Sequence, residues 1–178
     1  MSATYTKTIV VKGQGTRFES LASGAIYPGM LVELLAATTV RAHSTAQGFA
    51  EKAFAVEDEL QGRGIDTVYA SGSVLQYNIM EPGSVVNALI QDAANITFGD
   101  KLVSAGDGTL IKYVAQSIVD TIDGAGDSST DPGGTVSTTA VVTQRIVAVA
   151  MEDCNMSGSS LVDPAGPGLT GRCLVRIV

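Results

Sequence analysis

Short apolar runs separated by Gly, Pro or Asp dominate residues 71–113. In the first run, Leu75, Tyr77 and Ile79 alternate with polar residues, so that one face can be buried while the other is solvated. The next run, residues 85–90, is apolar on both faces, as expected of an interior strand. The pattern therefore predicts a series of β-strands.

Turn signals between these runs indicate how the strands are connected. Pro82-Gly83 is expected to reverse the chain between the first two runs. Gly99-Asp100 and Asp107-Gly108 each lie between strand-like runs, where an Asp-Gly pair favours a hairpin because both turn positions take positive φ. We therefore predict a β-meander across residues 71–113.

Strand-like runs also occupy both ends of the chain. Residues 2–12 are rich in Thr and β-branched side chains and fit an edge strand or a free arm, and residues 173–178 predict a last strand tied into the sheet. Residues 44–54 fit a short helix capped by Ser44 or a strand, and both alternatives stay open. The predicted fold class is mainly β, a compact barrel or sandwich-like domain with short helical segments.

The length of 178 residues suits one domain with appendages. We place an N-terminal arm at residues 1–15 and a single β-rich domain at residues 16–178. Within the domain, residues 123–134 are rich in Gly, Asp and Ser and predict a mobile loop at about 120–139.

A faint internal similarity suggests two related halves. Residues 29–32 (GMLV) resemble residues 100–103 (DKLV), and residues 55–58 (AVED) resemble residues 150–153 (AMED). The second pair of landmarks is farther apart than the first, by about the length of the 120–139 loop. Two interpretations follow: a duplicated β-half with an inserted loop, or a chance similarity between low-complexity β sequences.

Composition and charge narrow the function classes. Hydrophobic residues make up 45% of the chain, enough for a core, whereas charged residues make up only 16%, which favours burial of some surface against other subunits. The net charge of -7, without clustered Lys and Arg, disfavours direct nucleic-acid binding. No run has the length of a signal peptide's apolar region or of a membrane span, so we expect no membrane partner and folding in a cytosol.

Cysteine and histidine are scarce. Cys154 and Cys173 are the only cysteines, and His43 is the only histidine. This set cannot complete an ordinary closed zinc site unless carboxylates do so, and we predict no metal. In a reducing compartment we expect the two cysteines to be small buried hydrophobic residues rather than a disulfide.

Two groups of polar residues could carry chemistry. His43 lies beside Ser44, but the chain has no G-x-S-x-G nucleophile motif, and we interpret His43 as a surface or turn residue. Glu57 and Glu59 could act as paired carboxylates, although a solvated strand end or an ion-pair partner is the simpler interpretation. We therefore predict no catalytic residue, no cofactor and no enzyme activity.

Several sequence blocks occur in a distinctive order and spacing. They are GAIYPGMLVEL at 24–34, the segment from KAFAVEDEL to SVVNAL at 52–89, ITFGDKLVSAGDGTL at 96–110 and GRCLVRIV at 171–178. Together they resemble the small capsid decoration, or cement, proteins of tailed bacteriophages. The most specific parts are EDELQGRGID at 57–66 and GDKLVSAGDGTL at 99–110.

The resemblance implies a virion structural protein without catalysis. Such proteins are typically homotrimers at three-fold or quasi-three-fold positions on the outside of the mature head, where they clamp major-capsid subunits against the pressure of packaged DNA. We expect the arm to contact the capsid by adding to the sheet edge of a neighbouring subunit. The expected contact residues are Ala3, Thr4, Tyr5, Thr6 and Lys7.

Three other functions stay open. The chain could be another minor virion subunit, such as a coat or spike-base protein, that assembles with different symmetry. It could be a small β-barrel hydrolase or peptidase that uses Glu57, Glu59 or His43. It could also be a sugar-binding β-module, although five Tyr, four Phe and no Trp supply few aromatic platforms.

Overall fold

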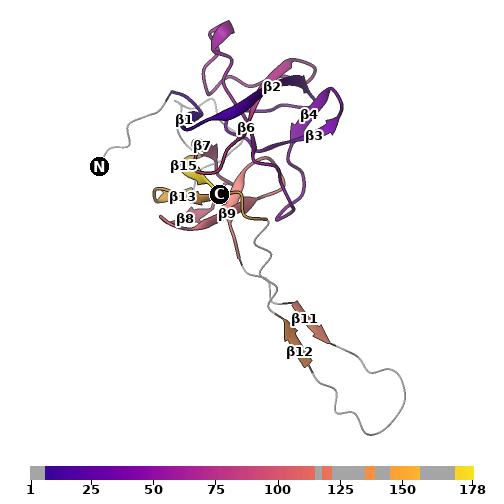
Figure 1. Ribbon diagram of the computed structural model, residues 1–178, viewed down its shortest axis with the longest axis vertical. Coiled ribbons are helices and arrows are strands. Elements are labelled where there is room, and N and C mark those ends of the chain that lie inside the picture. Colours follow the sequence, from indigo (N-terminus) through magenta and orange to yellow (C-terminus); the bar gives the residue numbers. More distant parts are fainter. Residues whose placement is uncertain (1–6, 115–117, 122–134, 139–144, 157–170) are drawn as a thin grey trace. The chain divides into compact units, whose positions relative to one another are not determined.

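The computed structural model describes residues 7–114, 118–121, 135–138, 145–156 and 171–178. These residues are mainly β, and their strands form four sheets (Figure 1). The chain divides into two compact units, Met1–Tyr113 with Gln144–Val178, and Val114–Thr143. Within the described ranges, no helix has both the length and the apolar character needed to cross a membrane.

A five-stranded sheet comes from the first half of the chain, in the order β3-β4-β2-β6-β5. Its strands are β2 (Gly15–Ala22), β3 (Val32–Ala36), β4 (Thr39–Ala42), β5 (Ala53–Ala55) and β6 (Val74–Met80). Strand β6 carries the predicted alternating run, and Leu75 and Tyr77 are buried as expected, but Gln76 between them is also buried, so the expectation of a solvated polar face is wrong at this position. Between β5 and β6 lies the 3₁₀ helix η1 (Glu59–Gln61), which ends at Gly62 in the left-handed conformation.

A six-stranded sheet has the order β1-β7-β15-β13-β9-β10. All of its strands except β1 come from the second half of the chain, from residue 85 onward. Its strands are β1 (Val10–Lys12), β7 (Val85–Leu89), β9 (Lys101–Ser104), β10 (Leu110–Lys112), β13 (Ala148–Ala150) and β15 (Arg172–Ile177). Every residue of β7 is buried, which confirms the predicted interior strand. Strand β15 lies between β7 and β13, so the C-terminal strand is tied into the sheet as predicted.

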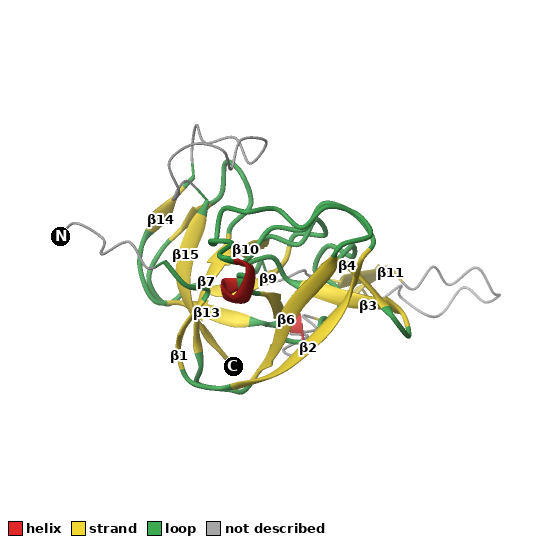
Figure 2. Cartoon of the chain, turned by 90° about the horizontal axis from the view of Figure 1, so that it is seen from above, coloured by secondary structure: helices red, strands yellow, loops and turns green. Residues whose placement is uncertain are grey.

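Two short sheets complete the described chain. Strand β8 (Asn95–Ile96) pairs with β14 (Cys154–Asn155), and β11 (Ile118–Thr121) pairs with β12 (Thr135–Thr138) in the second compact unit. Figure 2 shows β2, β3, β4 and β6 on one side of the first unit and β1, β7, β13 and β15 on the other. The fold is sandwich-like, and no sheet of the described strands closes into a complete barrel.

The predicted meander is only partly correct. Asp107-Gly108 does form the hairpin between β9 and β10, where Gly108 has a φ of 85° and Asp107 Oδ1 accepts a hydrogen bond from Thr109 N at 2.9 Å. Strands β6 and β7, on either side of Pro82-Gly83, join different sheets. Strands β8 and β9, on either side of Gly99-Asp100, also separate. A turn reverses the chain locally, but long-range partners such as β15 decide which sheet a strand joins.

The alternative of a helix over residues 44–54 is wrong. The N–H and the hydroxyl of Ser44 both donate to Glu33 Oε1, at 3.1 and 2.8 Å, so Ser44 does not cap a helix. The chain runs through a turn and enters β5 at Ala53. The bond to a neighbouring strand therefore replaces the local capping bond that the sequence suggested.

The two large sheets follow one pairing plan in the same register. The antiparallel pairs β2–β6 and β6–β5 are matched by β7–β15 and β15–β13, and β3–β4 is matched by β9–β10. Corresponding residue pairs are Phe18–Tyr77 with Val86–Val175, Ala53–Ile79 with Ala148–Ile177, and Val32–Ala42 with Leu102–Lys112. Even the parallel contact Ala22–Val40 has a counterpart in Ile90–Leu110.

This shared register supports the duplication, because chance similarity of short blocks does not produce matched pairing across whole sheets. The extra length of the second half falls between β10 and β13, where the second compact unit is inserted. In the structure, Gly29 of the first half corresponds to Gly99 of the second, and both have positive φ, at 91° and 87°. Gly29 N donates to Ala55 O, and Gly99 N makes the equivalent bond to Ala150 O. The sequence alignment of residues 29–32 with 100–103 is therefore displaced by one position.

Candidate functional site

Glu57 is buried, with 6% of its surface exposed, and it binds the first described segment of the chain. Its Oε2 accepts a hydrogen bond from Ile9 N at 3.0 Å, and its Oε1 accepts one from the Thr8 hydroxyl. Ile9 is fully buried in a small cluster with Val56 and Ile65. The interpretation of Glu57 as a solvated strand end is wrong, because a backbone donor buried with Ile9 requires an acceptor and this carboxylate supplies it.

The neighbouring acids have separate positions. Asp58 is buried and caps η1, where its Oδ1 accepts from Gln61 N at 3.3 Å. Glu59 is exposed. Glu57 and Glu59 line a cavity of about 150 Å³, together with Thr8, Val10, Arg17, Val56 and Asn78. Glu57 already accepts hydrogen bonds from Thr8 and Ile9, so it is not free to act with Glu59 as the carboxylate pair of a glycoside hydrolase.

His43 is also buried, at 1% exposure, which corrects its interpretation as a surface or turn residue. Its Nδ1 lies 2.7 Å from Ser104 Oγ and its Nε2 lies 3.0 Å from Phe49 O. A carbonyl can only accept, so Nε2–H is the donor to Phe49 O. Glu33 Oε2 lies 3.7 Å from Nε2.

The Glu33, His43 and Ser104 side chains resemble a serine-hydrolase triad only in residue type. Ser104 has no exposed surface, so its hydroxyl cannot meet a substrate in this conformation. Burial alone would raise the pKa of Glu33, but hydrogen bonds from Ser44 and Arg41 outweigh it and hold that pKa below its ordinary value. The group therefore fastens β3, β4 and β9 to the turn at residues 44–49.

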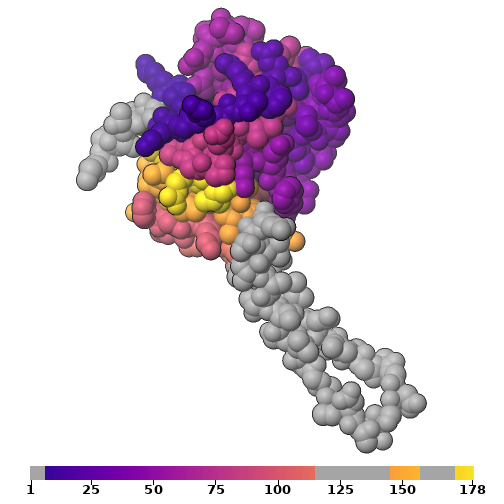
Figure 3. All heavy atoms as spheres, in the orientation of Figure 1, coloured from indigo at the N-terminus to yellow at the C-terminus, as the bar shows by residue number. Residues whose placement is uncertain are grey.

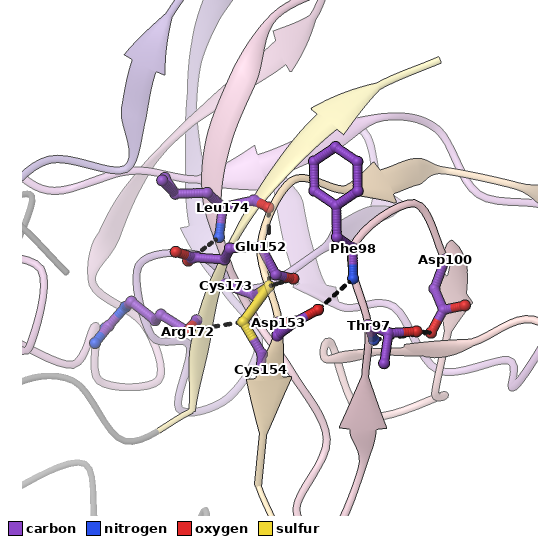
Figure 4. Close-up of a disulfide and its surroundings, with 9 residues drawn as sticks. All are labelled: Thr97, Phe98, Asp100, Glu152, Asp153, Cys154, Arg172, Cys173 and Leu174. Carbon is purple, nitrogen blue, oxygen red and sulfur yellow. Dashed lines mark hydrogen bonds between the residues drawn. A yellow bond between two sulfur atoms is a disulfide. The ribbon is translucent and has the colours of Figure 1, made fainter. Parts of the chain in front are cut away.

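Cys154 and Cys173 form a disulfide, so the expectation of two unpaired buried cysteines is wrong (Figure 4). It links β14 to β15, with the two Cα atoms 6.0 Å apart. The Glu152 carboxylate lies close to both sulfurs and accepts from Leu174 N at 2.8 Å. These three residues are the types that bind zinc, but sulfurs bonded to each other cannot act as thiolate ligands.

Large exposed apolar side chains occur on the five-stranded sheet. Phe18 on β2 is 41% exposed and stacks on Tyr77, with ring centroids 5.6 Å apart. Leu21 and Val74 form a cross-strand pair and are 42% and 51% exposed. Leu34 on β3 is 57% exposed. Because side chains alternate along a strand, Phe18 and Leu21 lie on opposite faces of the sheet and do not form one continuous apolar patch.

The predicted capsid-contact residues Ala3, Thr4, Tyr5 and Thr6 lie outside the described residues, as does most of the loop predicted at 120–139. Lys7, the last residue of that set, is exposed. The segment that follows is part of the domain, because Ile9 is buried and Val10 pairs with Val86. Any free arm therefore ends before Thr8, although the arm was predicted to extend to residue 15.

Comparison with known proteins finds similarity to solved structures only. No protein-family model and no curated protein matches the chain. Among solved structures, it is similar to the N base of the head fiber gp8.5 in bacteriophage phi29, with 13% sequence identity and a TM-score of 0.48, over 93% of this chain and 95% of that chain. A likeness at this level carries no argument about function.

Proposed function

We propose that the chain is a decoration, or cement, protein of a tailed bacteriophage, which binds the outside of the mature head as a homotrimer and stabilises it against internal DNA pressure. The order and spacing of the sequence blocks at 24–34, 52–89, 96–110 and 171–178 carry the proposal, because they resemble that family. The partners are other copies of the chain and the major capsid protein. Nucleic acid and membranes are not among them.

The positions of the two most specific blocks support a structural role. In the block at 57–66, Glu57 binds Thr8 and Ile9, and Asp66 pairs with the buried Arg172 at 2.8 Å. The block at 99–110 forms the β9–β10 hairpin. These contacts of the resembling residues therefore maintain the fold.

Attachment to the shell would use several weak contacts at once. A trimer that touches several capsid subunits gains affinity because later contacts form at high effective concentration. Residues 3–7 remain the proposed capsid-contact arm, adding backbone hydrogen bonds to the edge of a capsid sheet. Deletion of residues 1–6 tests this contact and leaves the Glu57 bonds intact. It is expected to reduce head occupancy while the trimer persists, and unchanged occupancy would remove the arm from the proposal.

The acidic balance of the chain supports a place on the outer surface. A net charge of -7 disfavours contact with packaged DNA and favours attraction to basic patches on the shell. Attachment should then weaken as the salt concentration rises, because exposed charges are screened over about 8 Å at physiological ionic strength. Affinity that is insensitive to salt would indicate apolar contacts instead.

The hydrolase alternative receives no support from the placement of its residues. His43 and Ser104 are buried together, and Glu57 is occupied by backbone and hydroxyl donors. Substitution of Glu59, which is exposed, should leave head binding unchanged. Loss of a measurable hydrolytic activity in an E59Q variant would favour the enzyme instead.

Solution mass and head imaging test the proposal directly. We expect the purified chain to have the mass of three copies of its 18.3 kDa chain. Heads imaged with and without the protein should differ at three-fold or quasi-three-fold positions on the outer surface. A different assembly symmetry on the virion would favour a minor coat or spike-base subunit, and a stable monomer would contradict the trimer.

A further inference from the structure

Strand β2 has an open edge along most of its length. On one side, β6 pairs with it from Gly15 to Leu21. On the other side, β4 pairs with it only at Leu21 and Ala22. No other described strand pairs with β2. The stretch from Gly15 to Ser20 therefore has a neighbour on one side alone.

The hydrogen bonds at the end of β2 show which backbone groups lie on the open side. Ala22 N donates toward β6, to Ser73 O, whereas Leu21 N donates toward β4, to Thr38 O. Because successive residues of a strand alternate sides, Arg17 and Glu19 direct their N–H and C=O groups to the same side as Leu21. Beyond the reach of β4, this side has no strand among the described residues.

The charged side chains of this edge form hydrogen bonds with β6. Arg17 donates to Gln76 Oε1 on β6, and Gln76 Nε2 donates to Glu19 Oε1 at 3.3 Å. Both charged side chains thus bond toward β6 and not across the open edge. Their residues are exposed, and so is Phe18 between them. Figure 3 shows the indigo part of the chain, which includes β2, at the surface of the molecule. Native edge strands are commonly shielded, and an unshielded edge is a template for a further strand.

The equivalent edge in the second half is already covered. Strand β7 corresponds to β2, and β1 pairs with it at Val86, the counterpart of Phe18. Asn87 N, the counterpart of Glu19 N, donates to Ile9 O at 2.8 Å. The duplicated plan therefore accepts a strand at this place, and the described part of the chain supplies one to β7 but none to residues 15–20 of β2.

The inserted β11–β12 hairpin lacks a third strand among the described residues, whereas β2 has an edge that could accept one. Strands β11 and β12 pair with each other through four residue pairs, and no other described strand pairs with either of them. An isolated two-stranded hairpin is marginally stable in water, so a third strand would stabilise it. Each of its strands has four residues, which fits within the open stretch of β2.

We propose that the β11–β12 hairpin of one copy adds to the open β2 edge of the next copy. This inference rests on the proposed homotrimer and names its interface. Donor and acceptor surfaces differ, so the contact is head-to-tail and builds a closed ring when the rotation permits, as in a trimer. Backbone hydrogen bonds at Arg17 and Glu19 supply the pairing, and the exposed Phe18 and Leu21 supply apolar surface next to it.

A matched pair of variants at Glu19 tests the acceptor edge. In E19P the ring removes the N–H on the open side and keeps the bonds of the flanking residues to β6, since proline is tolerated at an edge. E19T removes the same carboxylate but keeps the N–H. By light scattering at fixed concentration, we expect E19T to have the trimer mass of the unaltered chain and E19P to be a monomer. A trimeric E19P with an unchanged circular dichroism spectrum would overturn the inference.

A second variant tests the donor and does not depend on the fold of E19P. His43 in the first half corresponds to Tyr113 in the second, because their N–H groups make equivalent hydrogen bonds. Lys52 corresponds to Val147, because their C=O groups accept equivalent hydrogen bonds. Replacing Val114–Thr143 with a copy of residues 44–48 gives the second connection the length of the first. We expect this variant to fold as a monomer, and a trimer would overturn the inference.

The outcome for the unaltered chain separates this inference from the proposed function. If the unaltered chain is a trimer and binds heads while both variants also remain trimeric, the hairpin interface is wrong and the decoration function stands. If the unaltered chain is a monomer that does not bind heads, the proposed function fails and the interface fails with it.

Discussion

The two halves of the duplicated domain have the same strand pairing but differ in how they are completed. The second half has β1 on the edge of β7, a disulfide between β14 and β15, and an inserted hairpin. The first half has a β2 edge with no strand partner over residues 15–20 among the described residues, and both halves carry exposed apolar side chains, such as Phe18 and Phe98. The halves therefore differ in the pairing of this edge and in the cross-link, and not in the exposure of apolar side chains.

The disulfide between Cys154 and Cys173 is a further difference between the halves, and its equivalent positions in the first half can be identified from the strand pairing. The bridge between Ile26 and Tyr69 corresponds to the pair of Ile96 with Cys154, and Leu75 corresponds to Cys173. Where the second half has a disulfide, the first half has buried Tyr69 and Leu75 in one apolar cluster. The Tyr69 hydroxyl donates to Val56 O at 2.8 Å, and burial raises its pKa to about 12. At equivalent positions, apolar packing thus stabilises the first half and a disulfide stabilises the second.

Removal of β1 should have the largest effect, because it makes the second half resemble the first. Deletion of residues 1–12 removes the fully buried Ile9 and exposes the edge of β7. Loss of one buried aliphatic side chain alone costs about 2–5 kcal/mol. We expect a decrease of at least that size in the free energy of unfolding in urea. Deletion of residues 1–6 is the control and should change it by less than about 0.5 kcal/mol; equal effects would show that β1 contributes nothing to the domain.

Loss of the disulfide should have the next largest effect. The cysteines are separated by 19 residues, and closure of a loop of this size stabilises a protein by about 3 kcal/mol. A C154A/C173A variant is expected to unfold at a lower temperature than the oxidised protein. A reducing agent should lower the unfolding temperature of the unaltered chain but not that of the variant. If the agent affects both proteins equally, the cross-link is not the cause.

Neutralising Glu57 tests how β1 is held. In E57Q one carboxylate oxygen becomes an NH₂ group, which cannot accept, and the remaining oxygen must accept from both Thr8 and Ile9 without the negative charge that strengthens these bonds. Hydrogen bonds to charged groups contribute about 1.5–3 kcal/mol and neutral ones about 1 kcal/mol, so we expect a loss of stability of about 1 kcal/mol. E59Q is the matched control, since Glu59 is exposed and makes no side-chain hydrogen bond among the described residues. Equal stability of the two variants would contradict the assignment of Glu57.

The smallest effect concerns pH. The pKa of Glu33 in the folded protein is lower than its ordinary value of 4.5, so its contribution is present above that value and is lost as the pH falls through the folded pKa. We expect the unfolding temperature of the unaltered chain to exceed that of E33Q at pH 7, with the gap closing below pH 4.5. E51Q, at an exposed position, should show no such gap. A gap that persists at low pH would exclude the ionised carboxylate as its source.

Local features of the sequence predicted local structure well. The Asp107-Gly108 hairpin depends on positive φ at Gly108 and on a bond within the turn, and both are set by adjacent residues. The burial of β7 follows from its apolar composition. The separation of β6 from β7 could not be predicted in this way, because it depends on the C-terminal strand β15.

The polar residues were harder to interpret, because burial of one polar side chain leaves no periodic signal. Glu57 and His43 are buried by partners far along the chain, Ile9 and Ser104. The pairing of the cysteines depends on β14 lying beside β15, which their spacing does not show. The internal similarity was the one long-range signal in the sequence, and it indicated the duplicated plan despite its displacement by one position.

Binding of the purified protein to heads that lack it tests the central claim most directly. Such heads should be incubated with the protein, imaged, and challenged by heat or by low salt. The decoration function predicts trimeric density on the outer surface at three-fold or quasi-three-fold positions, and heads that retain their DNA under conditions that rupture the bare heads. Heads that remain bare at saturating protein, or that gain no resistance when covered, would contradict it.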